Sequence, residues 1–366
     1  MNEKRIGFII AGAGALIPQE LALAYHLMEE KKIKPCVFAG TSSGSLSSIF
    51  LNGVLQNEAG QGKLSWDVLK DVVFKLSNAD IYKNPAILDP ANEDDLKKIF
   101  GTISNMFSDG AIGKIIDGFK LLGELAGDKE NIKEMVASIM NIWNNGYVFD
   151  TSPLKATLTK YVNGKDYLDY QTLSQCYVPT HISAVNNVNG ETRRFYSKNT
   201  TDGQCNPVDV LLASTAIPVA FPSQKVGATP YVDGGTSTDD IPVEDLMHDG
   251  LYDEIYVIAP QSPGLISGYK HVMTENPLLS NLLFTLQVGH AAVTPFQLSR
   301  AMSLVKDKSK AFYYMPTLAK NYNMLDFTGS VLEEQFNQSL SWARNNSPRV
   351  IKDFLPQVDF ALETAP

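Results

Sequence analysis

Cysteine is scarce in this 366-residue sequence, with three residues at Cys36, Cys176 and Cys205. They are odd in number and far apart, and their spacing does not match that of paired zinc ligands. We therefore expect reduced structural cysteines, with neither disulfides nor a zinc site.

Positive charge is also limited. The chain has 31 Lys and Arg against 40 Asp and Glu, a net charge of −9, and no basic tract. Phosphate binding needs clustered Lys and Arg, so we do not expect nucleic acid as a partner. The same charge argues against simple electrostatic docking on an anionic membrane.

No apolar run is long enough to span a bilayer. Lys4 and Arg5 precede an uncharged run over residues 6–19, which imitates a secretory signal. We favour a buried strand over Ile6–Ala11 instead, because the residues just after it are needed for the chemistry described below. The expected location is the cytoplasm, with peripheral contact to membranes, and export is the alternative.

Hydrophobic residues make up 44% of the chain, enough for the core of a large α/β domain. Continuous apolar runs predict strands buried on both faces of a parallel sheet, and i, i+3, i+4 spacing predicts the helices. We expect one domain over residues 1–366. Residues 56–146 are helix-like and form a predicted insertion, either packed on the core or acting as a lid. Further strands are predicted over 178–185, 192–196, 254–259 and 311–315, and helices over 208–215 and 331–342.

A Gly-x-Ser-x-Gly turn lies between a predicted strand at Cys36–Ala39 and a predicted helix. In this context the pentapeptide Gly40-Thr41-Ser42-Ser43-Gly44 is typical of a nucleophile elbow. The turn needs glycine two residues before and two residues after the nucleophile, because side chains there would strike the backbone. Only Ser42 has glycine at both places, so Ser42 is the predicted nucleophile.

A run of small residues, Ala11-Gly12-Ala13-Gly14-Ala15, follows the first predicted strand. In a right-handed crossover the loops after both strands lie at the same edge of the sheet, so this loop can approach Ser42. Small side chains let the backbone come close. We therefore predict an oxyanion hole formed by the amides of Gly12, Ala13 and Gly14.

Farther along the chain, Tyr231 and Val232 deliver Asp233 into the turn Gly234-Gly235. Such a turn is a good way to present a carboxylate at the edge of a sheet, although Asp-Gly-Gly alone indicates only a turn. Asp233 is the candidate partner of the serine.

With these residues placed, the chain resembles the patatin-like phospholipases over residues 6–55 and 148–345. Besides the loop, the elbow and Asp233-Gly234-Gly235, the resemblance rests on Asp150–Leu154 and Ala213–Pro218 with Phe221-Pro222. It implies a three-layer α/β/α fold with a mostly parallel central sheet and a helical insertion. It also implies a Ser42–Asp233 dyad that hydrolyses phospholipids or other acyl lipids through an acyl-enzyme, with no cofactor or metal.

The chain departs from the family pattern in two places. The family loop usually has consecutive glycines and a basic residue, whereas here glycine alternates with alanine and no Lys or Arg lies between Ala11 and Glu20. The family often has asparagine before the proline that follows Asp-Gly-Gly, whereas here the segment is Thr238-Asp239-Asp240-Ile241-Pro242.

Two alternatives stay open at this point. The first is a Ser–Asp–His esterase, since His248, His271 and His290 all follow Asp233 in the order of an α/β-hydrolase triad. The second is a lipid-binding or regulatory protein that keeps the fold but catalyses weakly, as the altered loop suggests.

Overall fold

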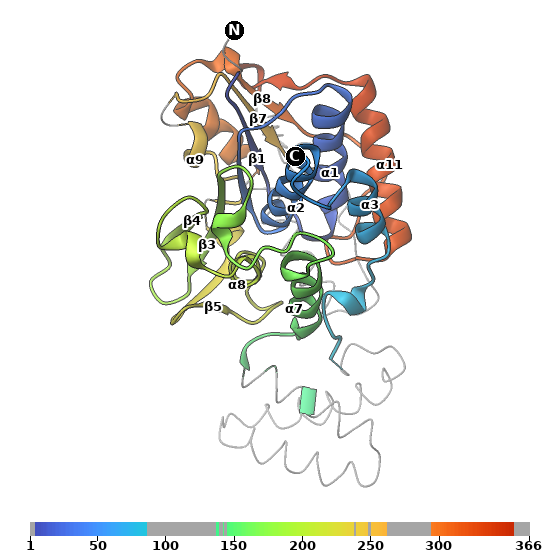
Figure 1. Ribbon diagram of the computed structural model, residues 1–366, viewed down its shortest axis with the longest axis vertical. Helices are drawn as coiled ribbons and strands as arrows, with labels where there is room; N and C mark the ends of the chain where they lie inside the picture. The colour runs from blue at the N-terminus through green and yellow to red at the C-terminus, as the bar shows by residue number, and fades with distance from the viewer. Residues whose placement is uncertain are drawn as a thin grey trace, which may run out of the picture.

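The computed structural model describes residues 4–85, 137–138, 142, 145–237, 239–247, 250–261 and 294–354. In this part of the chain a nine-stranded sheet lies between layers of helices (Figure 1). The expected α/β/α architecture with a mostly parallel central sheet is confirmed.

The centre of the sheet is parallel and runs in the order β3-β2-β1-β7-β8. Its strands are β1 (Ile6–Ile10), β2 (Val37–Thr41), β3 (Thr180–Asn186), β7 (Glu254–Ile258) and β8 (Ala311–Tyr314). Strands β1 and β2 are buried along their whole length, as expected of apolar runs covered on both faces. Because they are parallel neighbours, the loops that follow them lie at the same edge.

The outer strands are antiparallel. Strand β9 (Arg349–Val350) pairs with β8, and β4 (Thr192–Tyr196) pairs with β3. Strand β6 (Thr229–Asp233) also pairs with β3, and β5 (Gln224–Val226) pairs with β6. Since β4 occupies one edge of β3, strands β2 and β6 share its other edge.

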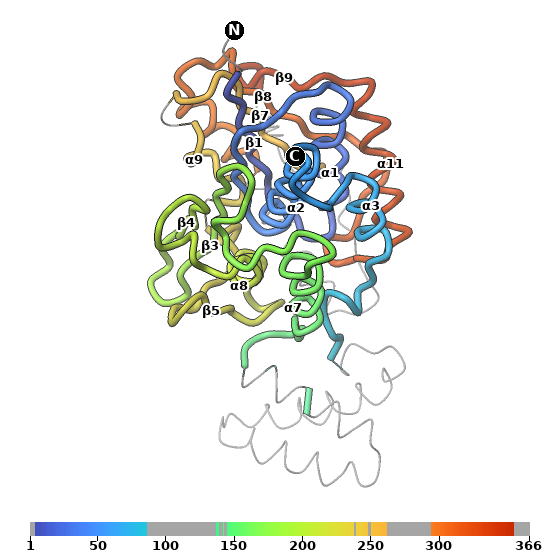
Figure 2. Tube along the Cα trace, in the orientation of Figure 1, coloured from blue at the N-terminus to red at the C-terminus, as the bar shows by residue number. Residues whose placement is uncertain are grey.

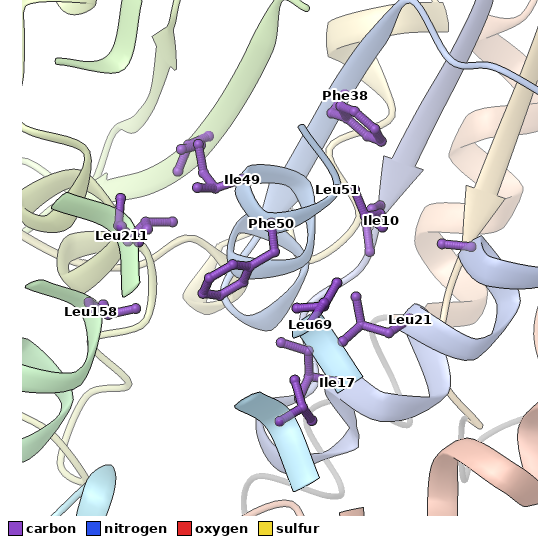
Figure 3. Close-up of a cluster of buried hydrophobic side chains, with 14 of the residues drawn as sticks. Ile10, Ile17, Leu21, Phe38, Ile49, Phe50, Leu51, Leu69, Leu158 and Leu211 are labelled. Atoms are coloured by element: carbon purple, nitrogen blue, oxygen red, sulfur yellow. The ribbon is translucent and has the colours of Figure 1, made fainter. Parts of the chain in front are cut away.

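One face of the sheet is covered by four helices, which Figures 1 and 2 show side by side. They are α1 (Ile17–Tyr25), α2 (Ser43–Glu58), α3 (Trp66–Phe74) and α11 (Gly329–Asn345). Helix α1 continues into one π-helical turn, His26–Glu30. Figure 3 shows the core on this face, where Ile10, Phe38 and Ile49 are fully buried.

The other face carries α9 (Glu244–Met247) and a helical segment over residues 294–304. Successive side chains of β1 point to opposite faces of the sheet and so belong to two separate hydrophobic cores. Phe8 and Ile10 pack on the side of α1 and α2. Ile9 packs on the other side with Leu246 and Leu298. This alternation places every residue of β1 in contact with an apolar layer.

Two shorter helices flank the end of the sheet where β6 arrives. They are α7 (Ser152–Leu158), which has Pro153 in its first turn, and α8 (Pro207–Ser214). Of the predicted insertion, the described residues up to 85 include α3, which packs against α11. Residues 86–136 lie outside the described residues. No helix in the described part of the chain is long and apolar enough to cross a membrane.

Candidate active site

Ser42 occupies a strained turn between β2 and α2. Its φ of 52° and ψ of −123° are rare for a residue with a side chain, and it is 6% exposed. A methyl group on Gly40 would lie 2.3 Å from the Gly44 carbonyl oxygen, and one on Gly44 would lie 2.2 Å from the Ile10 carbonyl oxygen. The glycine requirement that singled out Ser42 therefore has a direct steric cause.

Asp233 reaches Ser42 because two strands end head to head against β3. Thr41, the last residue of β2, pairs with Ser183, and Asp233, the last residue of β6, pairs with the next residue, Ala184. Both strands lie on the same edge of β3 and approach from opposite directions. One residue of a strand spans only about 3.3 Å, so the ends of β2 and β6 adjoin.

Asp233 is 4% exposed, and one of its two carboxyl oxygens has no hydrogen-bond partner among the described residues. Oδ1 accepts a hydrogen bond of 2.8 Å from the Gly235 amide. Oδ2 makes no hydrogen bond with any residue the structure describes, although the Ser42 hydroxyl lies close enough to lower the carboxyl pKa. Burial outweighs these contacts and raises the pKa of Asp233 to about 7. A carboxylate with that pKa is a far better general base than an exposed one.

A second buried carboxyl group, that of Asp240, lies beside this pair. Its Oδ1 would be 2.8 Å from a methyl group on Gly12 and 2.9 Å from one on Gly235. Its charge contributes to the raised pKa of Asp233. The segment that departs from the family's asparagine pattern therefore borders the candidate site.

The small-residue loop also borders Ser42, since a methyl group on Gly12 would lie 2.9 Å from the Ser42 Cβ. Two of the three predicted donors are engaged within the protein. The Gly12 amide donates to the Asp240 carbonyl at 3.0 Å, and the Ala13 amide donates to Ser43 Oγ at 2.8 Å. The amide of Gly14, whose φ is +57°, has no hydrogen-bond acceptor among the described residues.

Ser214, at the end of α8, organises the elbow, and sequence reasoning gave it no role. Its Oγ accepts a 3.0 Å hydrogen bond from the Ser42 amide and donates at 2.7 Å to the Ser183 carbonyl. Two residues on, the Ala216 carbonyl accepts the Asp233 amide at 2.9 Å. The motif Ala213–Pro218 was visible in the sequence, but only the fold shows that it touches both candidate residues.

None of the three histidines of the alternative triad is described by the structure. His248, His271 and His290 all lie outside the described residues. The two described histidines have other neighbours: His26 Nδ1 is 2.7 Å from Glu30 Oε2, and His181 Nδ1 is 3.5 Å from Asp245 Oδ2. Among the described residues no cluster of His, Cys, Asp or Glu is arranged to hold a metal ion.

Comparison with protein families gives a match to the model of the patatin-like phospholipases over residues 8–247, more than half of the chain. The chain belongs to the patatin-like phospholipase family. This family consists of lipid hydrolases, so the hydrolysis of lipid esters is the general activity that membership supports. The matched region runs from β1 through α9 and includes Ser42 and Asp233.

Two solved structures are similar to this patatin-like chain at low identity. VipD from Legionella pneumophila is 12% identical with a TM-score of 0.35, and the alignment covers 94% of this chain and 67% of VipD. The type III effector protein ExoU is 11% identical with a TM-score of 0.31, with 94% of this chain and 53% of ExoU covered. The chain thus spans about half of the length of ExoU. No curated protein gave a match.

Proposed function

We propose that this patatin-like protein hydrolyses the carboxylic esters of phospholipids or other acyl lipids through a Ser42–Asp233 dyad. The observation that carries the proposal is the pairing of a strained, buried serine with a buried carboxylate whose Oδ2 makes no hydrogen bond with described residues. The raised pKa of Asp233 suits that carboxylate to removing a hydroxyl proton near neutral pH.

In the proposed reaction, Asp233 accepts the Ser42 proton and the serine oxygen attacks the ester carbonyl. The alcohol or lysolipid leaves with a proton, and an acyl-enzyme remains on Ser42. Water, activated by Asp233, then releases the fatty acid. The substrate is a lipid held in a membrane or micelle, so transient contact with a membrane surface is part of the proposal.

The negative oxygen of the tetrahedral intermediate needs donors. We propose the amides of Gly14 and Ser43, because Ser43 begins α2 and its amide has no intrahelical acceptor. The positive end of the α2 dipole favours charge at this position. The Gly12 and Ala13 amides join them only if they leave their present acceptors.

The test is Ser42-dependent hydrolysis of a short-chain acyl ester and of mixed phospholipid micelles. We expect Ser42→Ala and Asp233→Asn each to lower kcat by at least about 1,000-fold, with folding unchanged by circular dichroism. Ser48→Ala is a matched control, because among the described residues this buried hydroxyl of the same helix bonds only the Gly44 carbonyl. Covalent labelling by a fluorophosphonate should be present in the wild type and absent from Ser42→Ala.

A catalytically weak lipid-binding protein is the second candidate, favoured by the engaged amides of Gly12 and Ala13. In that case Ser42→Ala and the wild type would hydrolyse the ester at the same low background rate, and the variant would still bind vesicles. The Ser–Asp–His alternative is tested by replacing His248, His271 and His290 together. The dyad predicts that this triple variant keeps its activity.

A further inference from the structure

Beneath the small-residue loop lies a buried carboxylic acid that the proposed mechanism does not use. Glu20 on α1 is 0% exposed, and both of its oxygens accept hydrogen bonds from α2. Ser43 Oγ donates to Oε1 at 2.9 Å, and Ser47 Oγ donates to Oε2 at 2.8 Å. Ser43 directly follows the candidate nucleophile, so Glu20 lies one hydrogen bond away from the elbow.

The same Ser43 hydroxyl connects Glu20 to the loop. A hydroxyl has one hydrogen, and Ser43 gives it to Glu20, so its lone pairs are left to accept the Ala13 amide at 2.8 Å. The Ala13 amide also has a single hydrogen. While that hydrogen is bonded to Ser43, the amide cannot donate a full hydrogen bond to an oxyanion above Ser42.

We propose that Glu20, acting through Ser43, controls whether the Ala13 amide is available as an oxyanion donor. Charged Glu20 holds the Ser43 hydroxyl and makes its oxygen a stronger acceptor, which retains the Ala13 amide. Neutral Glu20 carries no charge, so its bond with the Ser43 hydroxyl is weaker, Ser43 Oγ becomes a weaker acceptor, and the hold on the Ala13 amide weakens. Glu20 is therefore a positioning residue, and this inference rests on the proposed function.

Electrostatics act in the same direction. A negative charge one hydrogen bond behind the loop repels the developing oxyanion, in a buried site where screening is weak. The charged group that faces Glu20 from another element is Asp240, which adds to its raised pKa, whereas α2 offers the hydroxyls of Ser43 and Ser47. From α11, the neutral Gln335 bonds the neighbouring Gln19. Burial is the largest cause, and the pKa of Glu20 is raised to about 8.

The first test is the pH dependence of kcat/KM from pH 6 to 10 with a soluble acyl ester. In the wild type the rate should fall about tenfold by pH 9, as expected when a group with a pKa near 8 must keep its proton. Glu20→Gln stays neutral at every pH and should lose this alkaline fall. Ser43→Ala frees the Ala13 amide, so its kcat at pH 7 should be higher than that of the wild type.

Ser47→Ala is the matched control, because it removes the other hydroxyl on Glu20 and leaves the path to Ala13 intact. It should keep the alkaline fall, and circular dichroism at pH 9 should show all four proteins folded. An alkaline fall of unchanged size in Glu20→Gln overturns the proposal. So does a Ser43→Ala rate below that of the wild type at every pH.

A second measurement does not depend on activity. In a Ser42→Ala protein labelled with ¹⁵N-alanine, the Ala13 amide signal, assigned from Ala13→Gly, should shift with pH as Glu20 titrates. Adding Glu20→Gln should remove that shift. A pH-independent Ala13 signal overturns the relay, whereas a wild type without Ser42-dependent hydrolysis overturns only the proposed function.

Discussion

At the scale of single residues, the proposed chemistry depends on how burial changes the pKa values of two carboxyl groups. Asp233 and Glu20 lie near the two sides of the elbow, and burial is the main reason that both pKa values are raised, to about 7 and about 8. The proposed base must be charged and the proposed positioning residue must be neutral. The two requirements overlap only between the two values, so the active form is most populated between about pH 7 and 8.

The acid side of this window gives the first prediction. Below about pH 7 Asp233 holds a proton and cannot accept another, so kcat/KM should fall about tenfold per pH unit. The measurement is the initial rate with a soluble acyl ester from pH 5 to 8, with Glu20→Gln as the comparison because it leaves Asp233 untouched. A rate that stays level down to pH 5 would show that the base is another group.

The second prediction concerns the glycines of the elbow. In Gly44→Ala the new methyl group would lie 2.2 Å and 2.4 Å from the carbonyl oxygens of Ile10 and Ala11, so β1 and α2 must separate. We expect a loss of about 1–3 kcal/mol in unfolding free energy and little labelling of Ser42 by a fluorophosphonate. The control is Gly60→Ala, just beyond α2, where φ is +73° but nothing lies within 4 Å. Gly60→Ala should lower the unfolding free energy by about 1 kcal/mol and leave the labelling of Ser42 unchanged.

These residues also show what could be predicted from the sequence. Glycine at 40 and 44 distinguished Ser42 from Ser43, because the spacing of the motif is visible in the sequence. The clash that requires glycine at 44, with the carbonyl oxygens of Ile10 and Ala11, is visible only in the fold. The partners of Glu20 were not predictable, since an amphipathic helix does not reveal which of its residues faces Ser43 and Ser47. The engaged amides of Gly12 and Ala13 depend on a carbonyl more than 200 positions away and on a hydroxyl in the elbow.

At the scale of elements, the position of Asp233 depends on the direction of β6. The sequence predicted two apolar residues leading into an Asp-Gly-Gly turn, but not that this strand runs antiparallel to β3. Strand β6 also pairs with the same edge of β3 as β2 does, beyond the residue at which β2 ends. Strand direction and edge are set by pairing between distant segments, whereas each apolar run was recognisable locally. Thus the parallel centre was predicted and the edge that holds the aspartate was not.

The end of α8 gives the third prediction. Ser214 Oγ joins the Ser42 amide of the elbow to the Ser183 carbonyl of β3, so Ser214→Ala loosens the strained turn. We expect kcat to fall roughly tenfold, the effect of about 1.4 kcal/mol, with KM little changed. Thr215→Ala is the control, because that hydroxyl bonds carbonyl groups of its own helix, Leu211 and Leu212. Equal effects of the two variants would mean that α8 acts only through its general stability.

At the scale of the whole molecule, the two buried carboxyl groups would link the proposed catalysis to folding. Each binds its proton more tightly in the folded state than in the unfolded chain, where the ordinary pKa values are 3.8 for Asp and 4.5 for Glu. The stabilisation that a bound proton provides is complete below about pH 4. It is lost as the pH rises through the folded-state values near 7 and 8. The proposed site would therefore work where the fold has already lost most of this contribution.

The last prediction follows from this loss of stability with rising pH. The melting temperature of the wild type should fall between pH 5 and 9, because unfolding lets both groups release their protons. A shift of three pKa units corresponds to roughly 4 kcal/mol for each group as an upper limit. Asp233→Asn and Glu20→Gln should each flatten the dependence of the melting temperature on pH, and the double variant should flatten it most.

Asp307→Asn is the control, because the pKa of that exposed carboxyl is lowered by Ser309. A wild-type melting temperature that rises towards pH 9 would mean that the two carboxyl groups are charged in the folded protein at neutral pH. The proposed pH window for catalysis would then be wrong as well.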